Sequence, residues 1–328
     1  MNFHTEINLV LSDKPILHSD KIFTIGSCFA ENISDKLLEH KFQVCKNPFG
    51  VLYNPVSIKN ALEIVETQKI FTEEDLFFFQ SEWHSFFHHS NFSDIERSRC
   101  LNKINAITEN TYEFLKKADV AIVTLGTAFV YEHIESKQIV SNCHKIPSAM
   151  FNRFRLSVQE VKNELDSIQN LLKKINPNIR MIFTVSPVRH WKDGAIENSL
   201  SKAVLLLALS EALTDNSEYF PAYEIMMDDL RDYRFYDSDM IHPNKIAVEY
   251  IWEKFSERFF DDLTIKTLRE IQKIIAAVSH KIRNKGSEEN QRFIKKSILS
   301  IKNLTSKYQY LNLTAELNYF EKMINKSR

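Results

Sequence analysis

The sequence predicts an α/β protein in which helices cover both faces of a mainly parallel sheet. Three apolar runs have the composition of buried strands: Ile22–Ile25, Val120–Leu125 and "NIRMIFTVSPV", which contains Pro187. Almost unbroken apolar runs are typical of strands that are buried on both faces. Amphipathic segments with helical spacing separate these runs. Strands that alternate with helices indicate a three-layer α/β/α sandwich.

The remaining elements of this body follow from local patterns. "ENISDKLLEHKF" predicts the first helix, and Val56–Phe79 predicts the second. The aromatic stretch "FFFQSEWHSFFHHSNF" is predicted to form a hairpin or a packed insertion. A long amphipathic helix begins near Ser157, which has capping-box spacing with Glu160. "YFPAYEIMM" is predicted as a further strand, and "IHPNKIAVEYIWEKF" opens the last helix.

Charge divides the chain into two parts. The segment Leu263–Arg328 carries 14 Lys and Arg against 5 Asp and Glu, whereas the preceding residues carry 28 against 38. We therefore expect an acidic globular domain over residues 1–262 and a basic helical extension over residues 263–328. The extension lacks residues that suggest chemistry, and we expect it to be a cap or a homo-oligomerisation element.

The sequence favours a cytoplasmic protein. It shows no cationic N-terminus followed by an apolar signal core, and the run "AVLLLALSEAL" is shorter than the roughly 20 residues of a membrane span. The four cysteines lack CxxC spacing, so we expect free thiols in a reducing compartment. The basic extension carries few interleaved aromatic residues and no nucleic-acid motif, so we expect no nucleic-acid partner.

We expect neither a cofactor nor a metal. The chain contains neither GxxxxGK nor GxGxxG, the glycine-rich loops of nucleotide sites. His84 and His88 are four residues apart, as in a helical metal motif, but the glutamate of HExxH is missing and phenylalanines surround them. A packed aromatic cluster is the interpretation that this pattern favours.

The stretch "KIFTIGSCFAEN" is the best candidate for a catalytic turn. Its apolar strand ends at Gly26, and two potential nucleophiles, Ser27 and Cys28, stand before the first helix. The chain has only 5 glycines, against about 23 expected at an average usage of about 7%. A helix N-terminus lowers the pKa of a thiol and supplies donors for an oxyanion. Either residue fits a nucleophile at this turn.

Three further motifs fall at strand ends or before the last helix. "LGTAF" and "SPVRHW" follow strands, and "DSDMIHPN" supplies Asp239 and His242 at a D-x-x-H spacing. In open α/β sheets, ligands bind at the carboxyl ends of the strands. A nucleophile at such an end, with a histidine and a carboxylate, is the arrangement used for acyl transfer.

These motifs together resemble those of the GSCFA domain family. "GSCFA", "TLGTAFVY", "SPVRH", "DGAIEN", "SKAVL" and "DMIHP" occur in this order over about residues 1–260. The family is grouped with the SGNH (GDSL-like) hydrolases. The resemblance implies a flavodoxin-like sheet and an ester hydrolase or acyltransferase acting on a small-molecule or carbohydrate ester. A binding or scaffold protein that keeps the fold without the chemistry is the alternative.

The resemblance also implies roles at the first turn. Aligned without a gap, Gly26 takes the place of the glycine in the SGNH turn Gly-Asp-Ser, Ser27 that of the aspartate and Cys28 that of the nucleophile. A turn one residue tighter would make Ser27 the nucleophile. Thiol chemistry favours Cys28, because a thiol ionises far more easily than a hydroxyl. His242 would then act as general base and acid, and Asp239 would orient it.

The oxyanion hole is where the sequence departs from the SGNH pattern. The resemblance places this hole at Gly50, Gly126 and Thr127, with the backbone N–H groups of Cys28 and Gly50 as the expected donors, but the usual asparagine is replaced by Ala128. Thr127, Asn54 or Asn142 would be a substitute. We also expect substrate contacts from a second group of residues, namely His144, Arg189 and His190.

Overall fold

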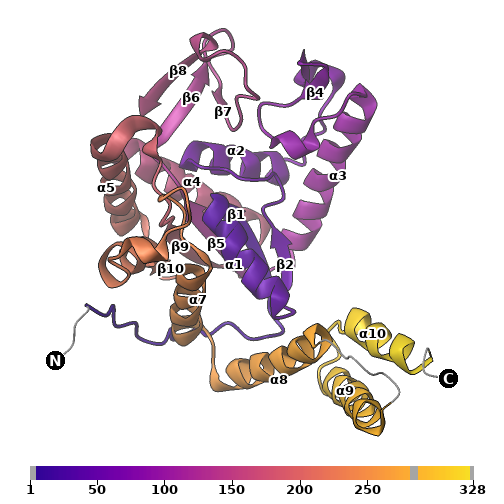
Figure 1. Cartoon of the computed structure of the whole chain (residues 1–328). Helices are drawn as coiled ribbons and strands as arrows, with labels where there is room; N and C mark the ends of the chain where they lie inside the picture. The colour runs from indigo at the N-terminus through magenta and orange to yellow at the C-terminus, as the bar shows by residue number, and fades with distance from the viewer. Residues whose placement is uncertain (1–4, 281–286, 326–328) are drawn as a thin grey trace. The chain divides into compact units, whose positions relative to one another are not determined.

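The computed structural model describes residues 5–280 and 287–325, and its contacts divide the chain into two units (Figure 1). The first unit comprises Lys21–Ser34, Val44–Phe255 and the N-terminal residues up to Leu9. The second comprises Val10–Asp20, Asp35–Gln43 and the chain from Ser256 onwards. The basic extension predicted from residue 263 thus forms a unit with two earlier segments, which the charge pattern does not reveal.

The centre of the first unit is a five-stranded sheet in the order β2–β1–β5–β9–β10. The strands are β1 (Lys21–Gly26), β2 (Gln43–Lys46), β5 (Val120–Leu125), β9 (Arg180–Val185) and β10 (Ser217–Phe220). β1 pairs parallel with β5, β5 with β9, and β9 with β10. Numbered along the chain, these strands lie in the order 2-1-3-4-5, which is the flavodoxin-like order. The predicted fold class is confirmed.

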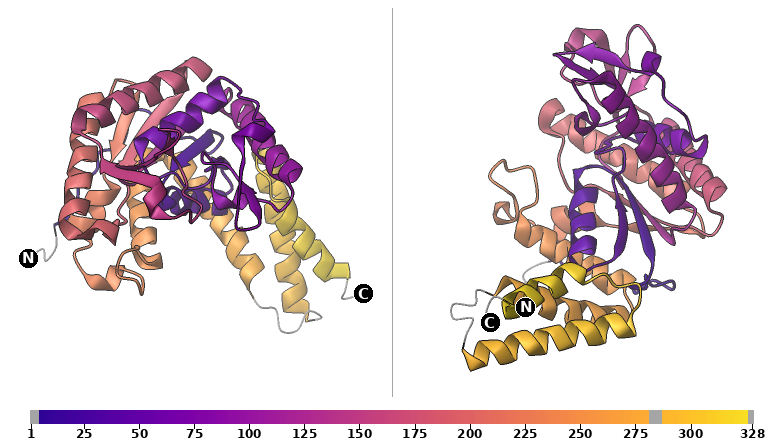
Figure 2. Two further views of the ribbon diagram at one scale, coloured as in Figure 1. Left: turned by 90° about the horizontal axis from the view of Figure 1, so that it is seen from above. Right: turned by 90° about the vertical axis from the view of Figure 1, so that its right-hand side faces the viewer.

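Helices lie on both faces of this sheet (Figure 2). The helices of one face are α2 (Pro55–Glu66), α3 (Arg97–Leu115), α4 (Val158–Ile175) and α5 (Gly194–Ala212). They pack on alternate residues of the strands, such as Phe23 and Ile25 of β1, to form the main core. The other face carries α1 (Cys28–Glu39), where Ser34 bonds Thr24 of β1, and α7 (Lys245–Phe259), where Phe255 packs on Phe220 of β10.

The second predicted helix, Val56–Phe79, is too long by more than a turn. α2 ends at Glu66, and Gln68 has a positive φ of 49° that no helix accommodates. The chain then enters the aromatic stretch, where β3 (Phe77–Phe79) and β4 (Glu82–His84) form an antiparallel hairpin. The prediction of a hairpin there is confirmed.

The segment "YFPAYEIMM" is a strand only at its start. β10 ends at Phe220, because Pro221 has no N–H to continue the ladder. The helix α6 (Ala222–Glu224) and a π-helical turn at Ile225–Asp229 follow.

A small antiparallel sheet, which the sequence did not predict, follows β5. Its strands are β6 (Phe129–His133), β7 (Ile139–Val140) and β8 (Phe151–Arg155), in the order β7–β6–β8. Because β6 starts directly after Ala128, this sheet is continuous with the motif "LGTAF" of the candidate site. Short 3-10 turns complete the unit at Glu73–Asp75, Ser90–Phe92, Ser148–Met150, Trp191–Asp193 and Tyr233–Phe235.

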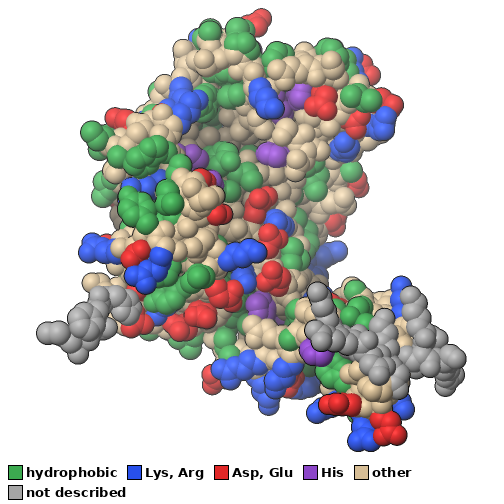
Figure 3. All heavy atoms as spheres, viewed as in Figure 1, with side chains coloured by type: hydrophobic (Ala, Val, Ile, Leu, Met, Phe, Trp, Pro, Cys, Tyr) green, Lys and Arg blue, Asp and Glu red, His purple; other side chains and the backbone are tan. Residues whose placement is uncertain are grey.

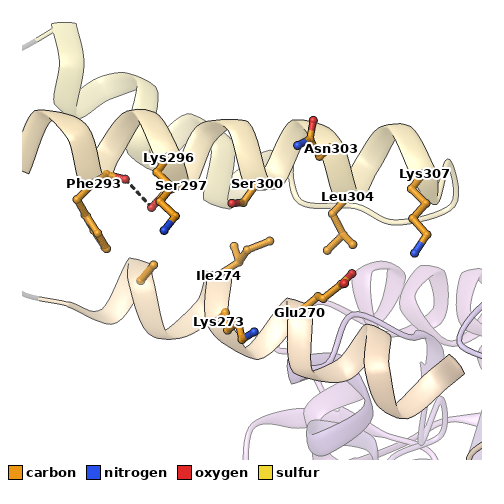
Figure 4. Close-up of a pocket in the computed structure, with 11 residues that line it drawn as sticks. Glu270, Lys273, Ile274, Phe293, Lys296, Ser297, Ser300, Asn303, Leu304 and Lys307 are labelled. Carbon is orange, nitrogen blue, oxygen red and sulfur yellow. Dashed lines mark hydrogen bonds between the residues drawn. The ribbon is translucent and has the colours of Figure 1, made fainter. Parts of the chain in front are cut away.

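The second unit is helical. α8 (Asp262–Ser279), α9 (Glu288–Lys307) and α10 (Thr314–Asn325) share a core that includes Ile271, Ile301 and Phe320. A cavity of about 530 Å³ opens between α8 and α9, and Ile274 and Leu304 point into it (Figure 4). None of the described helices combines the length and the apolar character that crossing a membrane requires.

Candidate active site

The Gly-Ser-Cys turn lies where the strand order of the sheet reverses. β1 and β5 are adjacent, and the connections from them run to opposite sides, so their carboxyl ends form the switch point of the sheet. Gly26 has a φ of 139°, and a Cβ there would lie 2.1 Å from the carbonyl oxygen of Thr124. The N–H of Ser27 donates to that same oxygen over 3.0 Å. Only glycine therefore allows β1 to end this close to β5.

Ser27 and Cys28 are placed differently by this turn. Ser27 is 0% exposed, and its Oγ has no hydrogen-bond partner among the described residues. Cys28 is the first residue of α1 and is only partly buried. The backbone N–H groups of Cys28 and Phe29 act on this side chain and lower the pKa of the thiol. Of the two side chains, Cys28 is the one that a ligand can reach.

The expected activation of the Cys28 thiol is only partly present. Burial raises the pKa of Cys28, and Glu31 raises it further. The charge of Lys202 and the backbone N–H groups of the helix start lower it, but they do not outweigh burial. The helix start thus lowers the pKa of Cys28 as expected, but burial has the larger effect in the free protein.

Gly126 is the point at which three segments meet. A Cβ added there would lie 2.9 Å from the Tyr53 carbonyl oxygen, 3.2 Å from His190 Nε2 and 3.2 Å from Ser27 Cβ. The loop after β5 consequently packs directly on the Gly-Ser-Cys turn and on the ring of His190. This close approach explains the position of one of the few glycines.

The backbone N–H groups at Gly50, Gly126 and Thr127 are already engaged. The N–H of Gly50 donates to Asn47 over 2.7 Å, and those of Gly126 and Thr127 donate to Tyr53 over 2.8 and 2.9 Å. The expected role of the Gly50 N–H as an oxyanion donor is therefore corrected. The other expected donor, the N–H of Cys28, lies at the start of α1, where the N–H groups of Cys28 and Phe29 lower the pKa of the thiol.

Ala128, where the SGNH pattern has asparagine, is held by α5. Its N–H donates to Ser201 Oγ over 2.8 Å, and Ser201 Oγ lies 3.0 Å from Thr127 Oγ1. Thr127 Oγ1 also accepts the N–H of Phe129 over 3.1 Å. The Thr127 hydroxyl therefore braces its own loop, although Thr127 lines the adjacent cavity.

Asn54 lies at the start of α2 and keeps one polar group available. Its Oδ1 accepts the N–H of Ser57 over 2.9 Å and caps the helix. Its Nδ2 has no hydrogen-bond partner in the described part of the chain, and the residue lines the same cavity as Thr127. Asn142 lines this cavity too: its Oδ1 accepts the N–H of His144, and its Nδ2 likewise has no partner among the described residues. Both asparagines predicted as substitutes thus keep an amide donor.

Asp239 and His242 form a pair in the loop before α7. His242 Nδ1 lies 2.6 Å from Asp239 Oδ2, and Asp239 Oδ1 accepts the N–H groups of Ile241 and His242, each over 2.9 Å. These hydrogen bonds lower the pKa of Asp239 to about 2. The charge of His242 reaches His190, whose ring adjoins Gly126. The pair belongs to the same unit as Cys28.

A cavity of about 610 Å³ lies beside the turn, and Figure 3 shows a hollow with basic and histidine side chains around it. It is lined by Val51, Tyr53, Asn54, His89, Thr127, Phe129, Tyr131, Val140, Ser141, Asn142, Cys143, Lys145, Ile146, Ser148, Phe151, Arg153, His190 and Lys192. Arg153 lies over the rings of Phe129 and Tyr131 and pairs with Asp193. The lining thus combines aromatic faces, amides and cations.

The other three residues that were predicted to contact the substrate lie in three different places. His190 lines this cavity, and burial lowers its pKa to about 4, so that its ring is neutral at pH 7. Arg189 lines a second cavity, of about 400 Å³, together with Asp239. His144 lies elsewhere: it is buried, bonds the Ser85 carbonyl through Nε2 and lines neither cavity. His144 is therefore a packed residue in this structure, and the prediction that it contacts the substrate is corrected.

The histidines of the aromatic stretch are packed as the sequence analysis favoured. His84 bonds Ser93 through Nδ1 and the Phe79 carbonyl through Nε2. His88 stacks on Phe49 with ring centroids 4.8 Å apart and bonds Ser85. Burial lowers the pKa of His88 to about 3.

Comparison with protein families assigns the chain. The GSCFA family profile matches residues 21–255, which is most of the chain. The chain belongs to the GSCFA family. The profile of the C-terminal domain of GSCFA domain proteins matches residues 271–326. A search of curated proteins finds no match.

Solved structures resemble this GSCFA protein only distantly. A carbohydrate esterase family 3 protein from Talaromyces cellulolyticus is 10% identical with a TM-score of 0.34, and the match covers 77% of this chain and 99% of that one. An acetyl xylan esterase from the rumen bacterium Butyrivibrio proteoclasticus is 12% identical with a TM-score of 0.31, over 74% and 64% of the two chains. Similarity at this level carries no conclusion about the reaction.

Sequence reasoning missed one residue of this GSCFA site. Lys202 of α5 is fully buried, and its Nζ donates to the carbonyl oxygens of Gly126 and Ser186, each over 2.7 Å. It lies within reach of the charge of Cys28. The signal was available, because the motif "SKAVL" places a lysine on the same helix face as Leu205 and Leu209, which a core-facing helix seldom does.

Proposed function

We propose that the first unit of this GSCFA protein is an SGNH-like ester hydrolase or acyltransferase with Cys28 as its nucleophile. The observation that carries the proposal is the position of Cys28 at the first residue of α1, at the switch point of the sheet. A side chain there is accessible to a ligand and faces the helix N-terminus. Ser27 is fully buried and is the weaker choice.

In the proposed reaction, Cys28 Sγ attacks the acyl carbon of an ester. His242, oriented by Asp239 through Nδ1, takes the thiol proton at Nε2 and returns it to the leaving alcohol. The tetrahedral oxyanion is received by the N–H groups of Cys28 and Phe29. A thioester on Cys28 results, and water or an acceptor alcohol then releases the acyl group.

The cavity beside the turn supports an acylated carbohydrate as the substrate. Aromatic rings present flat apolar faces, and the amide of Asn54 and the hydroxyl of Tyr131 present hydrogen-bonding groups at its wall. A few polar groups among aromatic ones are the usual lining of a site for a small polar ligand. Lys192 adds positive charge and favours an anionic or strongly polar substrate, whereas the charge of Arg153 is paired with Asp193.

A second candidate function is a binding protein without catalysis. It is favoured by Ala128, whose side chain cannot donate to an oxyanion, and by the raised pKa of Cys28. Such a protein would bind the same ligand in the same cavity without turnover.

Turnover of small esters separates the two functions. The full chain and its Cys28→Ala, His242→Ala and Cys45→Ala variants are tested on p-nitrophenyl acetate and on an acetylated xylo-oligosaccharide. We expect the first two variants to lose turnover, and Cys45→Ala, a matched control with another partly buried free thiol that lies outside the cavity, to keep it. If the wild-type chain binds the saccharide but releases no acetate, the binding function is supported and the enzyme proposal fails.

A further inference from the structure

Lys202 is a buried ammonium group without a carboxylate partner in the part of the chain that the structure describes. Its side chain is 1% exposed. Nζ donates to the carbonyl oxygens of Gly126 and Ser186, which directly follow β5 and β9. The two carbonyls satisfy two of its three protons, but they do not neutralise its charge. Burying a charge is costly unless an anion compensates it.

Two observations place Lys202 beside the Gly-Ser-Cys turn: its Nζ donates to the Gly126 carbonyl, and a Cβ on Gly126 would lie 3.2 Å from Ser27 Cβ, next to Cys28. Cys28 is therefore a group close to Lys202 that can become an anion. The charge of Lys202 lowers the pKa of Cys28, and Cys28 raises the pKa of Lys202, which is the mutual effect of two groups that can form an ion pair. The other charged or titratable groups that face one or the other are Glu31, Tyr53, Arg189, His190 and Tyr223. The charge of Glu31 disfavours the Cys28 thiolate, and the charge of Arg189 disfavours the Lys202 ammonium group. Neither residue therefore takes the place of the other member of the Lys202–Cys28 pair.

We infer that Lys202 is a positioning residue of this site: its ammonium group is the counter-ion of the Cys28 thiolate and holds the ends of β5 and β9 around it. The inference rests on the proposed function only in taking Cys28 as the reactive thiol. When the thiolate forms, the S–H bond breaks, and its proton passes to His242 or to water. Lys202 keeps its three protons, and the charge left on sulfur faces the ammonium group.

Burial acts on both members of this pair in the direction that makes them depend on each other. It raises the pKa of Cys28 and lowers that of Lys202 to about 7. Each charged form is therefore unfavourable alone and favoured when the other is charged. Burial accounts for the raised pKa of this thiol at a helix N-terminus, and the charge of Lys202 opposes that effect.

Two substitutions distinguish the effect of the Lys202 charge from that of its hydrogen bonds to the Gly126 and Ser186 carbonyls. In Lys202→Gln the charge is gone, but an amide with two N–H donors remains one atom closer to the backbone than Nζ. In Lys202→Met, whose side chain is as long as that of Gln, both the charge and the donors are gone. If the role of Lys202 is purely structural, Lys202→Gln should behave as wild type. If Lys202 is a counter-ion, both variants should lose thiol reactivity at Cys28.

The test is alkylation of Cys28 by iodoacetamide as a function of pH, resolved by peptide mass spectrometry in the full chain. We expect Lys202→Gln to slow the labelling of Cys28 about tenfold or more at pH 7, as a pKa increase of one unit or more requires. Cys143 in the same sample is the internal control and keeps its rate. Equal rates and pH profiles for wild type and Lys202→Gln would overturn the inference.

A second measurement does not depend on the folding of these variants. In Cys28→Ala, with Lys202 intact, nuclear magnetic resonance of the lysine Nζ groups reports the pKa of Lys202. We expect it to be lower than in wild type, because the counter-ion is lost, and an unchanged pKa would overturn the inference. Ester turnover is measured in parallel: its absence in wild type refutes the proposed function, whereas the Cys28 and Lys202 titrations decide the inference separately.

Discussion

Nδ1 of His242 lies 2.6 Å from Oδ2 of Asp239, while Oδ1 of the same carboxylate accepts the backbone N–H of His242 over 2.9 Å. One carboxylate therefore fixes both the ring and the backbone of the histidine. This bidentate arrangement leaves Nε2 of the ring as the nitrogen available for proton transfer. A histidine held in this way is a suitable general base even at a partly exposed position.

Asp239→Asn should lower kcat on an ester while changing KM little. The amide keeps the shape of the side chain, but its negative charge, which is present above about pH 2 in the folded chain, is lost. By analogy with other carboxylate–histidine pairs, a loss on the order of 10²–10⁴ in kcat is expected. Steady-state kinetics at pH 7 checks this, with Asp237→Asn as the neighbouring control; equal losses in the two variants would contradict a specific role for Asp239.

Ser201→Ala should destabilise the first unit. The hydroxyl accepts the buried N–H of Ala128, and its removal leaves that donor without a partner. An unsatisfied buried donor costs about 1–3 kcal/mol of unfolding free energy. The matched control is Ser199→Ala on the same helix, where an exposed hydroxyl only bonds Ala195 and little change is expected. Urea unfolding of the full-length variants measures both, and equal stabilities would show that Ser201 does not brace the loop.

Gly126→Ala should disturb the turn without a change of charge. The new methyl group would lie 2.9 Å from the Tyr53 carbonyl oxygen and 3.2 Å from both His190 Nε2 and Ser27 Cβ. Overpacking of this kind typically costs about 1–3 kcal/mol. Because the strain falls on the Gly-Ser-Cys turn, we expect Cys28 labelling and ester turnover to fall together. Retention of both at wild-type levels would show that the three segments do not pack this closely.

The stability of the first unit should decrease as the pH falls below about 6.5. The pKa of His88 is lowered to about 3 in the folded chain, so between these two values the unfolded state binds a proton that the folded state does not. Stability therefore rises with pH across this window, by up to about 1.4 kcal/mol per pH unit for one histidine.

His88→Phe should remove this part of the pH dependence, because phenylalanine fits an aromatic environment formed by Phe49 and Phe71 and does not titrate. The exposed His280→Phe is the control and should leave the slope unchanged. Urea unfolding from pH 4 to pH 8 compares the slopes. An unaltered slope in His88→Phe would contradict the assignment of the effect to His88.

The fold could be predicted from the sequence where the pattern is local. The apolar runs of β1, β5 and β9 are long enough, and the segments between them amphipathic enough, to specify a parallel sheet between helices. The short strands β6–β8 were missed because they lie directly beyond β5, in a segment whose first residues continue its apolar run. The second unit could not be delimited, since Val10–Asp20 and Asp35–Gln43 join it through tertiary contacts only.

The candidate site shows the same limit. Asp239 and His242 are three residues apart, so their pairing follows from local geometry and could be predicted. The engagement of the Gly126 and Thr127 N–H groups depends on the carbonyl of Tyr53, which lies far away in sequence. Lys202 reaches the carboxyl ends of β5 and β9 from α5, and only the folded arrangement reveals this.

The most direct test of the account is the site of covalent acylation. The full chain is mixed with p-nitrophenyl acetate, quenched within the first turnover and mapped by fragmentation mass spectrometry. The account predicts an acetyl thioester on Cys28 that neutral hydroxylamine removes, that persists in Ser27→Ala and that is absent in Cys28→Ala. An acetyl ester on Ser27, or turnover by Cys28→Ala at the wild-type rate, would contradict it.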